Sequence, residues 1–174
     1  KYILKKNSRL KKYILNIILL ILPSTRFFKF KSLMFSIFCD VIGYNVRINQ
    51  GVKFFGNSKV SIGDNSWIGI NCMISSSKPG CVKIGKNCDI GPNVTIVNGS
   101  HQIGDSNRRA GKGISFDIEI GDGVWIGSSA TINGGAVIGK GSIISSGSVV
   151  IKGTYPENVI LGGVPAKVIK DLDG

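Results

Sequence analysis

The chain has 174 residues, of which 43% are hydrophobic, and a formal net charge of +12. A chain of this length and hydrophobic content can bury one domain-sized core, which excludes an intrinsically disordered protein. Ten of the Lys and Arg residues precede residue 51, where Asp40 is the only acid. Such a basic excess suits an anionic membrane, phosphorylated ligands or nucleic acid. No nucleic-acid recognition motif accompanies it, so we expect no nucleic-acid partner.

Residues 1–41 form an apolar, basic segment. Its two stretches RLKKYILNIILLIL and FFKFKSLMFSIF are rich in helix formers and predict a helical extension. The apolar run over residues 13–22 is too short for a bilayer span, which needs about 20 residues. The sequence therefore leaves two alternatives open. The segment either lies as an interfacial helix on the cytosolic face of the membrane or packs against the rest of the protein.

A six-residue repeat dominates the chain from residue 42 to residue 174. Aliphatic residues recur at this period, at Ile62, Ile68, Ile74, Ile84, Ile90, Ile96, Ile120, Ile126, Ile132, Ile138, Ile144 and Val150. A period of six matches neither the helix nor the strand, so it describes a corner that recurs after each short strand. Three sides then close a coil of about 18 residues, with small residues at the corners. The pattern predicts an all-β solenoid.

Two breaks in the repeat predict where loops leave the coils. Ile74 and Ile84 are ten residues apart, and the pattern vanishes between Ile96 and Ile120. Because a solenoid core tolerates insertions only outside its coils, we expect residues 99–117 to form a protruding loop. At the other end, the segment from Pro165 to Leu172 is expected to be a short C-terminal helix.

The cysteines, at positions 39, 72, 81 and 88, contain no CxxC pair, and His101 is the only histidine. A zinc site needs more ligands of this kind, so we expect no metal. A core of this size needs no disulfides, which favours free thiols and a cytoplasmic location. The residues at 72 and 88 also fit the solenoid interior, four positions after an Ile.

The segment IGDGVWIGSSATINGGAVIGKGSIISSGSVV, followed by GGVPAKVIK, resembles the hexapeptide-repeat acyltransferase family. The resemblance implies a left-handed parallel β-helix over residues 42–174 and acetyl-CoA as the acetyl donor. It also implies a homotrimer, because similar enzymes build each active site between two β-helices. Among the family's members, the chain is most similar to O-acetyltransferases of sugars and surface polysaccharides.

The resemblance assigns His101 as the catalytic base, because similar sugar acetyltransferases carry a histidine at this break in the repeat. A histidine side chain, with an unperturbed pKa of about 6.5, is suited to accepting a hydroxyl proton at cytosolic pH. The alternative is a solvated loop histidine. Asn71 matches the position of an acceptor-binding Asn, whose amide can both donate and accept hydrogen bonds. Asn at a repeat corner is equally typical of turn chemistry.

Other matching positions are expected to contact the cofactor. Trp125 resembles a tryptophan beside the pantetheine arm, although Trp67 shares its phase in the repeat and an outward aromatic also suits a subunit interface. Ser128 matches a serine near the thioester, and the backbone at Ser146 is expected to follow the pantetheine. Basic positions that match phosphate contacts are Lys152, Lys167 and Lys170.

These assignments predict an acetyl-CoA-dependent O-acetyltransferase for a sugar of a cell-surface polysaccharide, such as O-antigen or capsule, or its precursor. The N-terminal extension favours this prediction because it resembles enzymes of those pathways. One alternative is N-acetylation of a nucleotide-linked amino sugar. The alternative from another class is a non-catalytic β-helix scaffold at the membrane surface, for which the same repeat would suffice.

Overall fold

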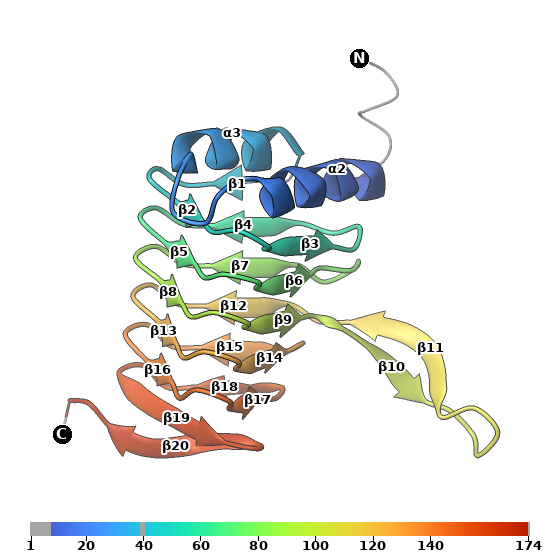
Figure 1. Cartoon of the computed structure of the whole chain (residues 1–174). Coiled ribbons are helices and arrows are strands. Elements are labelled where there is room, and N and C mark those ends of the chain that lie inside the picture. Colours follow the sequence, from blue (N-terminus) through green and yellow to red (C-terminus); the bar gives the residue numbers. More distant parts are fainter. Residues whose placement is uncertain (1–7, 39–40, 174) are drawn as a thin grey trace.

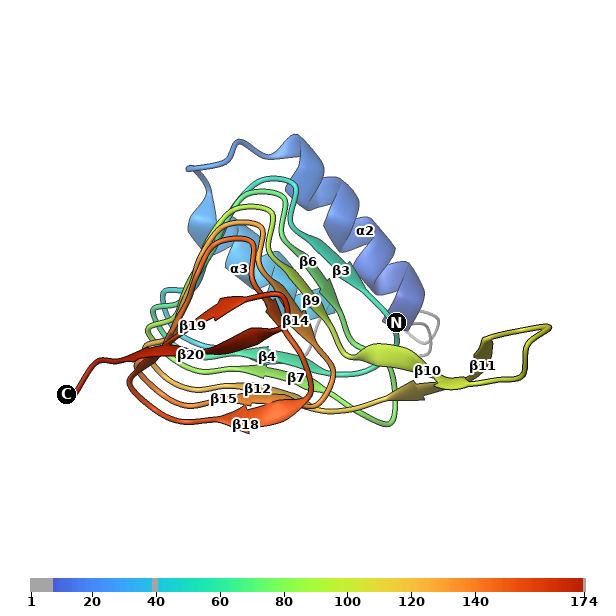
Figure 2. The same ribbon diagram turned by 90° about the horizontal axis from the view of Figure 1, so that it is seen from below.

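A computed structural model describes residues 8–38 and 41–173, so the expectations for residues 1–7 and for Cys39 lie outside the described residues. The repeat forms a left-handed parallel β-helix with a triangular cross-section (Figures 1 and 2). Its three sides are named faces A, B and C below. The predicted all-β solenoid is therefore confirmed.

Each coil contributes one short strand to each face, and strands from successive coils pair in parallel. Face A contains β1 (Val41–Ile42), β4 (Val60–Ile62), β7 (Val82–Ile84), β12 (Ile118–Ile120), β15 (Ala136–Ile138) and β18 (Gly153–Tyr155). Face B contains β2 (Arg47–Ile48), β5 (Trp67–Ile68), β8 (Asp89–Ile90), β13 (Trp125–Ile126), β16 (Ile143–Ile144), β19 (Val159–Gly163) and β20 (Ala166–Asp171). Face C contains β3 (Lys53–Phe55), β6 (Met73–Ser75), β9 (Thr95–Val97), β14 (Thr131–Asn133) and β17 (Val149–Val150).

The interior is built from the repeating aliphatic positions, which are stacked and buried as their spacing predicts. The column Ile68, Ile90, Ile126 and Ile144 is at most 1% exposed. Small residues four positions later fill the corners, and those with a hydroxyl or thiol group form hydrogen bonds between coils. Cys72, for example, is fully buried and donates its thiol proton to the Gly91 carbonyl at 3.1 Å.

Two helices, α2 (Ser8–Ile21) and α3 (Phe28–Phe38), cover the first coil (Figure 1). The Asn16 amide pairs with both backbone groups of Phe54 on β3, accepting from its N–H at 2.7 Å and donating to its carbonyl at 3.0 Å. Phe35 of α3 packs edge-on against Phe54, with ring centroids 4.7 Å apart. The helices therefore satisfy edge groups that a further coil would otherwise pair.

Lys31 is the largest fully buried side chain of this cap. Its ammonium donates to the carbonyls of Pro23 (2.6 Å) and Ser24 (3.1 Å), which fixes the connection between the two helices. Burial lowers the pKa of Lys31. No helix among the described residues is long and apolar enough to cross a membrane.

The predicted C-terminal helix over residues 165–172 is wrong. This segment contains β20, which pairs antiparallel with β19 and extends face B. Without β20, the edge of β19 would leave its backbone groups unpaired. Pairing them stabilises a strand here more than Pro165 favours the first turn of a helix. The predicted loop over residues 99–117 does protrude, but it is largely a β-hairpin of β10 (Gly99–Ile103) and β11 (Ala110–Ser115).

Candidate functional site

The hairpin that carries His101 projects from the edge between faces C and A, away from the coils (Figures 1 and 2). His101 lies on β10 opposite Gly113, and its side chain is exposed. The Asp105 carboxylate accepts the N–H groups of Asn107 (2.9 Å) and Arg108 (3.1 Å) and thereby shapes the hairpin turn. Within the described chain no hydrogen bond to the imidazole is found, so the ring is available to a ligand.

Both breaks in the repeat lie at this C–A edge, and hydrogen bonds connect the two inserted segments. Asn98, just before the hairpin, accepts the Ser77 N–H at 2.7 Å and donates to the Ser77 carbonyl at 3.0 Å. Ser115, at the end of the hairpin, accepts the Gly80 N–H at 3.1 Å. The base of the hairpin is therefore anchored by buried hydrogen bonds, while its tip extends into solvent.

A second group of predicted residues lines the corner between faces B and C. Ser128 and Ser146 are exposed, occupy equivalent positions in successive coils, and have N–H groups that donate to no backbone carbonyl in the described chain. A Cβ added to the neighbouring Gly127 would lie 2.5 Å from the Ser146 nitrogen. The glycine thus permits the close stacking of these corners. Trp125, 56% exposed on face B, flanks them, and the three residues are called the B–C strip below.

Two of the three predicted lysines continue this strip. Lys170 on β20 is aligned with Trp125 through Ile143 and Ile160, on successive strands of face B. Lys167 pairs with Gly162, and Gly162 lies close to Ser145, the residue that precedes Ser146 of the strip. Lys152 is separate from them. Its ammonium lies 4.6 Å from the Phe116 ring centroid, at the C–A edge.

Asn71 is exposed at the B–C corner, two coils before Ser128. Its backbone has φ of 59°, the left-handed conformation that Asn93 and Ser129 share at the same corner position. This geometry is typical of Asn in turns. The exposed amide remains available to an acceptor.

A single chain does not bring all the predicted residues together. His101 and Lys152 lie at the C–A edge, whereas Asn71 and the B–C strip lie at the other edge of face C. The side between these edges spans about five residues of extended chain, or about 16 Å. A site that uses both edges needs a second copy of the chain or a ligand that crosses face C.

A hollow of about 270 Å³, which the sequence did not predict, lies on face B between the two tryptophans. Its lining includes Trp67, Asp89, Trp125 and the buried Asn49. The Oδ1 atom of Asn49 is buried and has no hydrogen-bond partner. Asn49 follows Ile48 at a position where the next coils have glycine. This departure from the repeat is the feature of the sequence that could have indicated the hollow.

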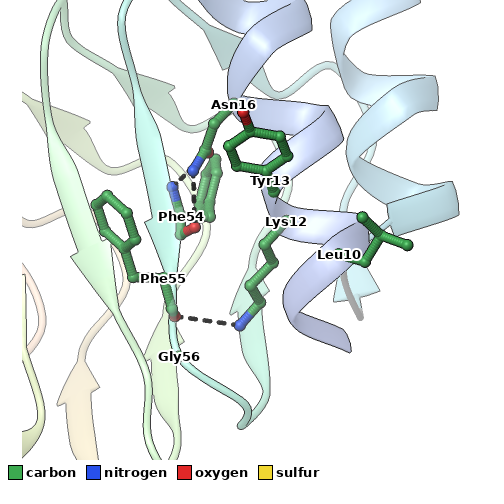
Figure 3. Close-up of a pocket in the computed structure, with 7 residues that line it drawn as sticks. All are labelled: Leu10, Lys12, Tyr13, Asn16, Phe54, Phe55 and Gly56. Atoms are coloured by element: carbon green, nitrogen blue, oxygen red, sulfur yellow. Dashed lines mark hydrogen bonds between the residues drawn. The ribbon is translucent and has the colours of Figure 1, made fainter. Parts of the chain in front are cut away.

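A larger hollow, of about 520 Å³, lies between α2 and β3 (Figure 3). Lys12 and Asn16 point into it from α2, but both are engaged with the β3 region. The Lys12 ammonium donates to the Ser58 carbonyl at 2.9 Å, and Asn16 pairs with Phe54. The hollow is otherwise lined by apolar side chains such as Tyr13 and Phe55. Among the described residues, no group of three potential metal ligands is found.

Comparisons with known proteins agree with this architecture. Two protein-family models match the chain. The model described as bacterial transferase hexapeptide (six repeats) matches residues 117–152, and the model described as hexapeptide repeat of succinyl-transferase matches residues 59–98. The galactoside O-acetyltransferase of Escherichia coli K12 is 39% identical over 145 residues, which cover 83% of this chain and 70% of the relative.

Solved structures give the same result. A galactoside acetyltransferase in complex with coenzyme A has a TM-score of 0.81 and 30% identity, over 99% of this chain and 84% of that one. A hexapeptide-repeat acetyltransferase of Vibrio cholerae, complexed with acetyl coenzyme A, shares the fold with a TM-score of 0.78 and 24% identity, over 95% and 87% of the two chains. The repeat, the coil architecture and these relatives together show that the chain belongs to the hexapeptide-repeat acetyltransferases.

Proposed function

We propose that this acetyltransferase moves the acetyl group of acetyl-CoA to a sugar hydroxyl, with His101 as the general base. The observation that carries the proposal is the placement of the chain's only histidine, exposed on an anchored hairpin beside the solenoid. The 39% identity to a galactoside O-acetyltransferase supports a sugar hydroxyl as acceptor.

The B–C strip has the features that a coenzyme A arm requires. A pantetheine arm is narrow and carries amide groups, so it suits a groove with an aromatic wall and free backbone donors. Trp125 supplies the wall, and the unpaired N–H groups of Ser128 and Ser146 supply the donors. Lys167 and Lys170 lie where the strip continues toward the end of the solenoid, and their charges suit the phosphates.

In the proposed reaction, acetyl-CoA supplies an activated acyl carbon. His101 takes the proton of the acceptor hydroxyl as the hydroxyl oxygen bonds to that carbon and the carbon–sulfur bond breaks. The imidazolium then returns the proton to the departing thiolate, so the products are the sugar ester and coenzyme A. Backbone N–H groups of the strip are suited to stabilise the charge that develops on the acyl oxygen. Asn71 orients the acceptor hydroxyl.

A homotrimer is the arrangement proposed to complete this site. Because His101 and the B–C strip lie on opposite edges of face C, the histidine of one copy would serve the strip of the next. Lys152, at the edge that carries the hairpin, would reach the phosphates bound to the neighbouring strip. Cyclic symmetry then repeats the same heterologous contact three times and closes the ring.

The acceptor is proposed to be a sugar of a cell-surface polysaccharide, or its precursor, acetylated in the cytoplasm at the inner face of the membrane. Helix α2 supports this placement, because one of its faces packs on the solenoid while the other leaves Tyr13, Ile17 and Leu20 between 42% and 64% exposed. An apolar helix face in a basic protein suits contact with anionic lipid.

The test is incubation of the pure protein with acetyl-CoA and either a galactoside or a nucleotide-linked amino sugar, followed by mass spectrometry. We expect an acetylated galactoside whose modification is lost on mild base treatment, as for an ester. A base-stable product on the amino sugar alone would instead identify an N-acetyltransferase. Absence of transfer to either, together with no thermal shift by coenzyme A, would favour the scaffold.

A further inference from the structure

The hollow on face B combines two aromatic walls with one carboxylate. Trp67 on β5, Asp89 on β8 and Trp125 on β13 are directly aligned on successive strands. The strand spacing places the backbones of the two tryptophans about 10 Å apart, with that of Asp89 between them. The Phe28 ring packs against Trp67 with centroids 5.7 Å apart, which holds this wall in place. Thr25, from the connection between the helices, also lines the hollow.

Asn49, which lines the hollow, has an unpaired polar atom in its side chain. Its Nδ2 donates to the Ile68 carbonyl at 2.8 Å, which fixes the orientation of the amide. Its Oδ1, on a residue only 1% exposed, has no partner. A buried carbonyl without a donor is unfavourable and uncommon in native proteins, so the atom points to a ligand that brings an O–H or N–H group.

These features define the chemistry of the ligand. Its faces must be apolar enough to lie against indoles, and its rim must carry donors for Asn49 and Asp89. A pyranose ring has C–H faces and a rim of hydroxyls, and it meets both requirements. A volume of about 270 Å³ lies near the lower end for small-molecule sites and suits one ring. The Asp89 carboxylate disfavours an anionic sugar.

We propose that this hollow binds a neutral or amino pyranose ring that neighbours the acetylated ring, so that the acceptor is an oligosaccharide of at least two units. The inference rests on the proposed sugar acetyltransferase activity. The position of the hollow supports it, since Ile70 in its lining directly precedes Asn71, the proposed acceptor ligand. Gly91, also in its lining, stacks on the corner that holds Ser128, because a Cβ added to Gly91 would lie 2.8 Å from the Ser128 nitrogen, so acceptor and donor would meet at this corner.

The first experiment is a fluorescence titration that needs no enzymatic activity. The chain contains only two tryptophans, so Trp125→Phe leaves Trp67 as the sole reporter and retains an aromatic wall. The probes are maltose, methyl α-glucoside, glucosamine, glucuronic acid and adenosine. We expect saturable changes with maltose, the glucoside and glucosamine, and at least tenfold weaker binding of glucuronic acid. No response to any of the three sugars, or a response to adenosine alone, would overturn the proposal.

Substitutions in the same background separate binding from folding. Asp89→Asn and Asn49→Gly should each raise the dissociation constant of the glucoside about tenfold. Their thermal midpoints should stay near that of the parent, because glycine already occupies the position of Asn49 in the next coils. Glu119→Gln, which removes the same charge from a partly exposed residue on face A, ion-paired with Lys83 away from the hollow, is the matched control and should bind normally. Equal binding by all three variants would contradict the assignment.

The second experiment measures acetyl transfer to maltose and to methyl α-glucoside. We expect a lower KM for the disaccharide, and Trp67→Ala should reduce that preference at least tenfold. If transfer occurs without any preference that depends on Trp67, the further inference fails while the proposed function stands. If no sugar is acetylated but the titration succeeds, the hollow binds pyranose and the proposed acetylation fails.

Discussion

His101 and Ser128 lie at opposite edges of face C, separated by the width of one side of the solenoid. This separation conflicts with a reaction that uses both residues within one chain. The proposed trimer removes this conflict, because His101 of a neighbouring copy can lie beside Ser128 of the first copy.

Mixing two inactive variants tests whether the site is shared. His101→Ala and Trp125→Ala are each expected to be nearly inactive, and the two should be denatured and refolded together at equal concentration. If each site takes its histidine and its strip from different copies, random assembly restores about a quarter of the sites. Activity that stays at the level of the single variants would show that each chain forms its own site. Light scattering of the wild type should give the mass of a trimer.

Removing the imidazole should affect chemistry alone. We expect His101→Ala to lower kcat by about 10²–10⁴, because the proton transfer loses its base while the B–C strip still binds coenzyme A. The matched control is Gln102→Ala, the adjacent exposed residue of the same strand, which should retain turnover. Steady-state kinetics and a coenzyme A thermal shift provide the two readouts. An active His101→Ala variant would exclude the proposed mechanism.

The buried thiol of Cys72 makes stability depend on pH. Burial raises the pKa of Cys72 to about 11 from its usual 9.0, so the native state keeps a proton that the unfolded chain loses. This contribution is fully present below pH 9 and is lost as the pH rises through about 11. The resulting decrease in the free energy of unfolding is about 2–3 kcal/mol.

Cys72→Ser is the variant that isolates this effect, because serine at equivalent corners, such as Ser66, makes the same kind of hydrogen bond. Urea unfolding from pH 8 to pH 11 should show a smaller loss of stability for the variant than for the wild type. Parallel curves would mean that the thiol does not titrate in this range. Groups common to both proteins cancel in the comparison.

Membrane contact should depend on the exposed face of α2. Ile17→Ser combined with Leu20→Ser should reduce flotation with anionic vesicles at low salt, because the apolar area available to the lipid decreases. The control is Leu33→Ser, a similarly exposed leucine on α3. Equal flotation of both variants and the wild type, or no flotation of the wild type, would leave α2 a purely structural helix.

The repeat made most of the fold predictable, because each buried isoleucine is specified by its own spacing. Ile126, for example, needs only its place in the register to be assigned to the interior. The terminal segment escaped this reasoning because β20 exists only through its pairing with β19, a contact between residues whose local sequence also suits a helix.

The candidate site was predicted in part for the same reason. His101, Ser128 and Trp125 stand out in the sequence, but their distribution over two edges depends on how the coils close. The hollow on face B escaped because Asn49 and Asp89 become neighbours of the tryptophans only after coils stack. A single Asn in place of a repeat glycine carries little information until its unpaired oxygen is seen.

The pairing of Asn16 with Phe54 also has a consequence for assembly. A variant without α2 and α3 would begin with β1, β2 and β3 as bare strand edges, each a template for another chain. Solenoids with such ends can stack head to tail into filaments, since every added coil satisfies the edge before it. The two helices therefore prevent another molecule from adding strands to this end of the solenoid.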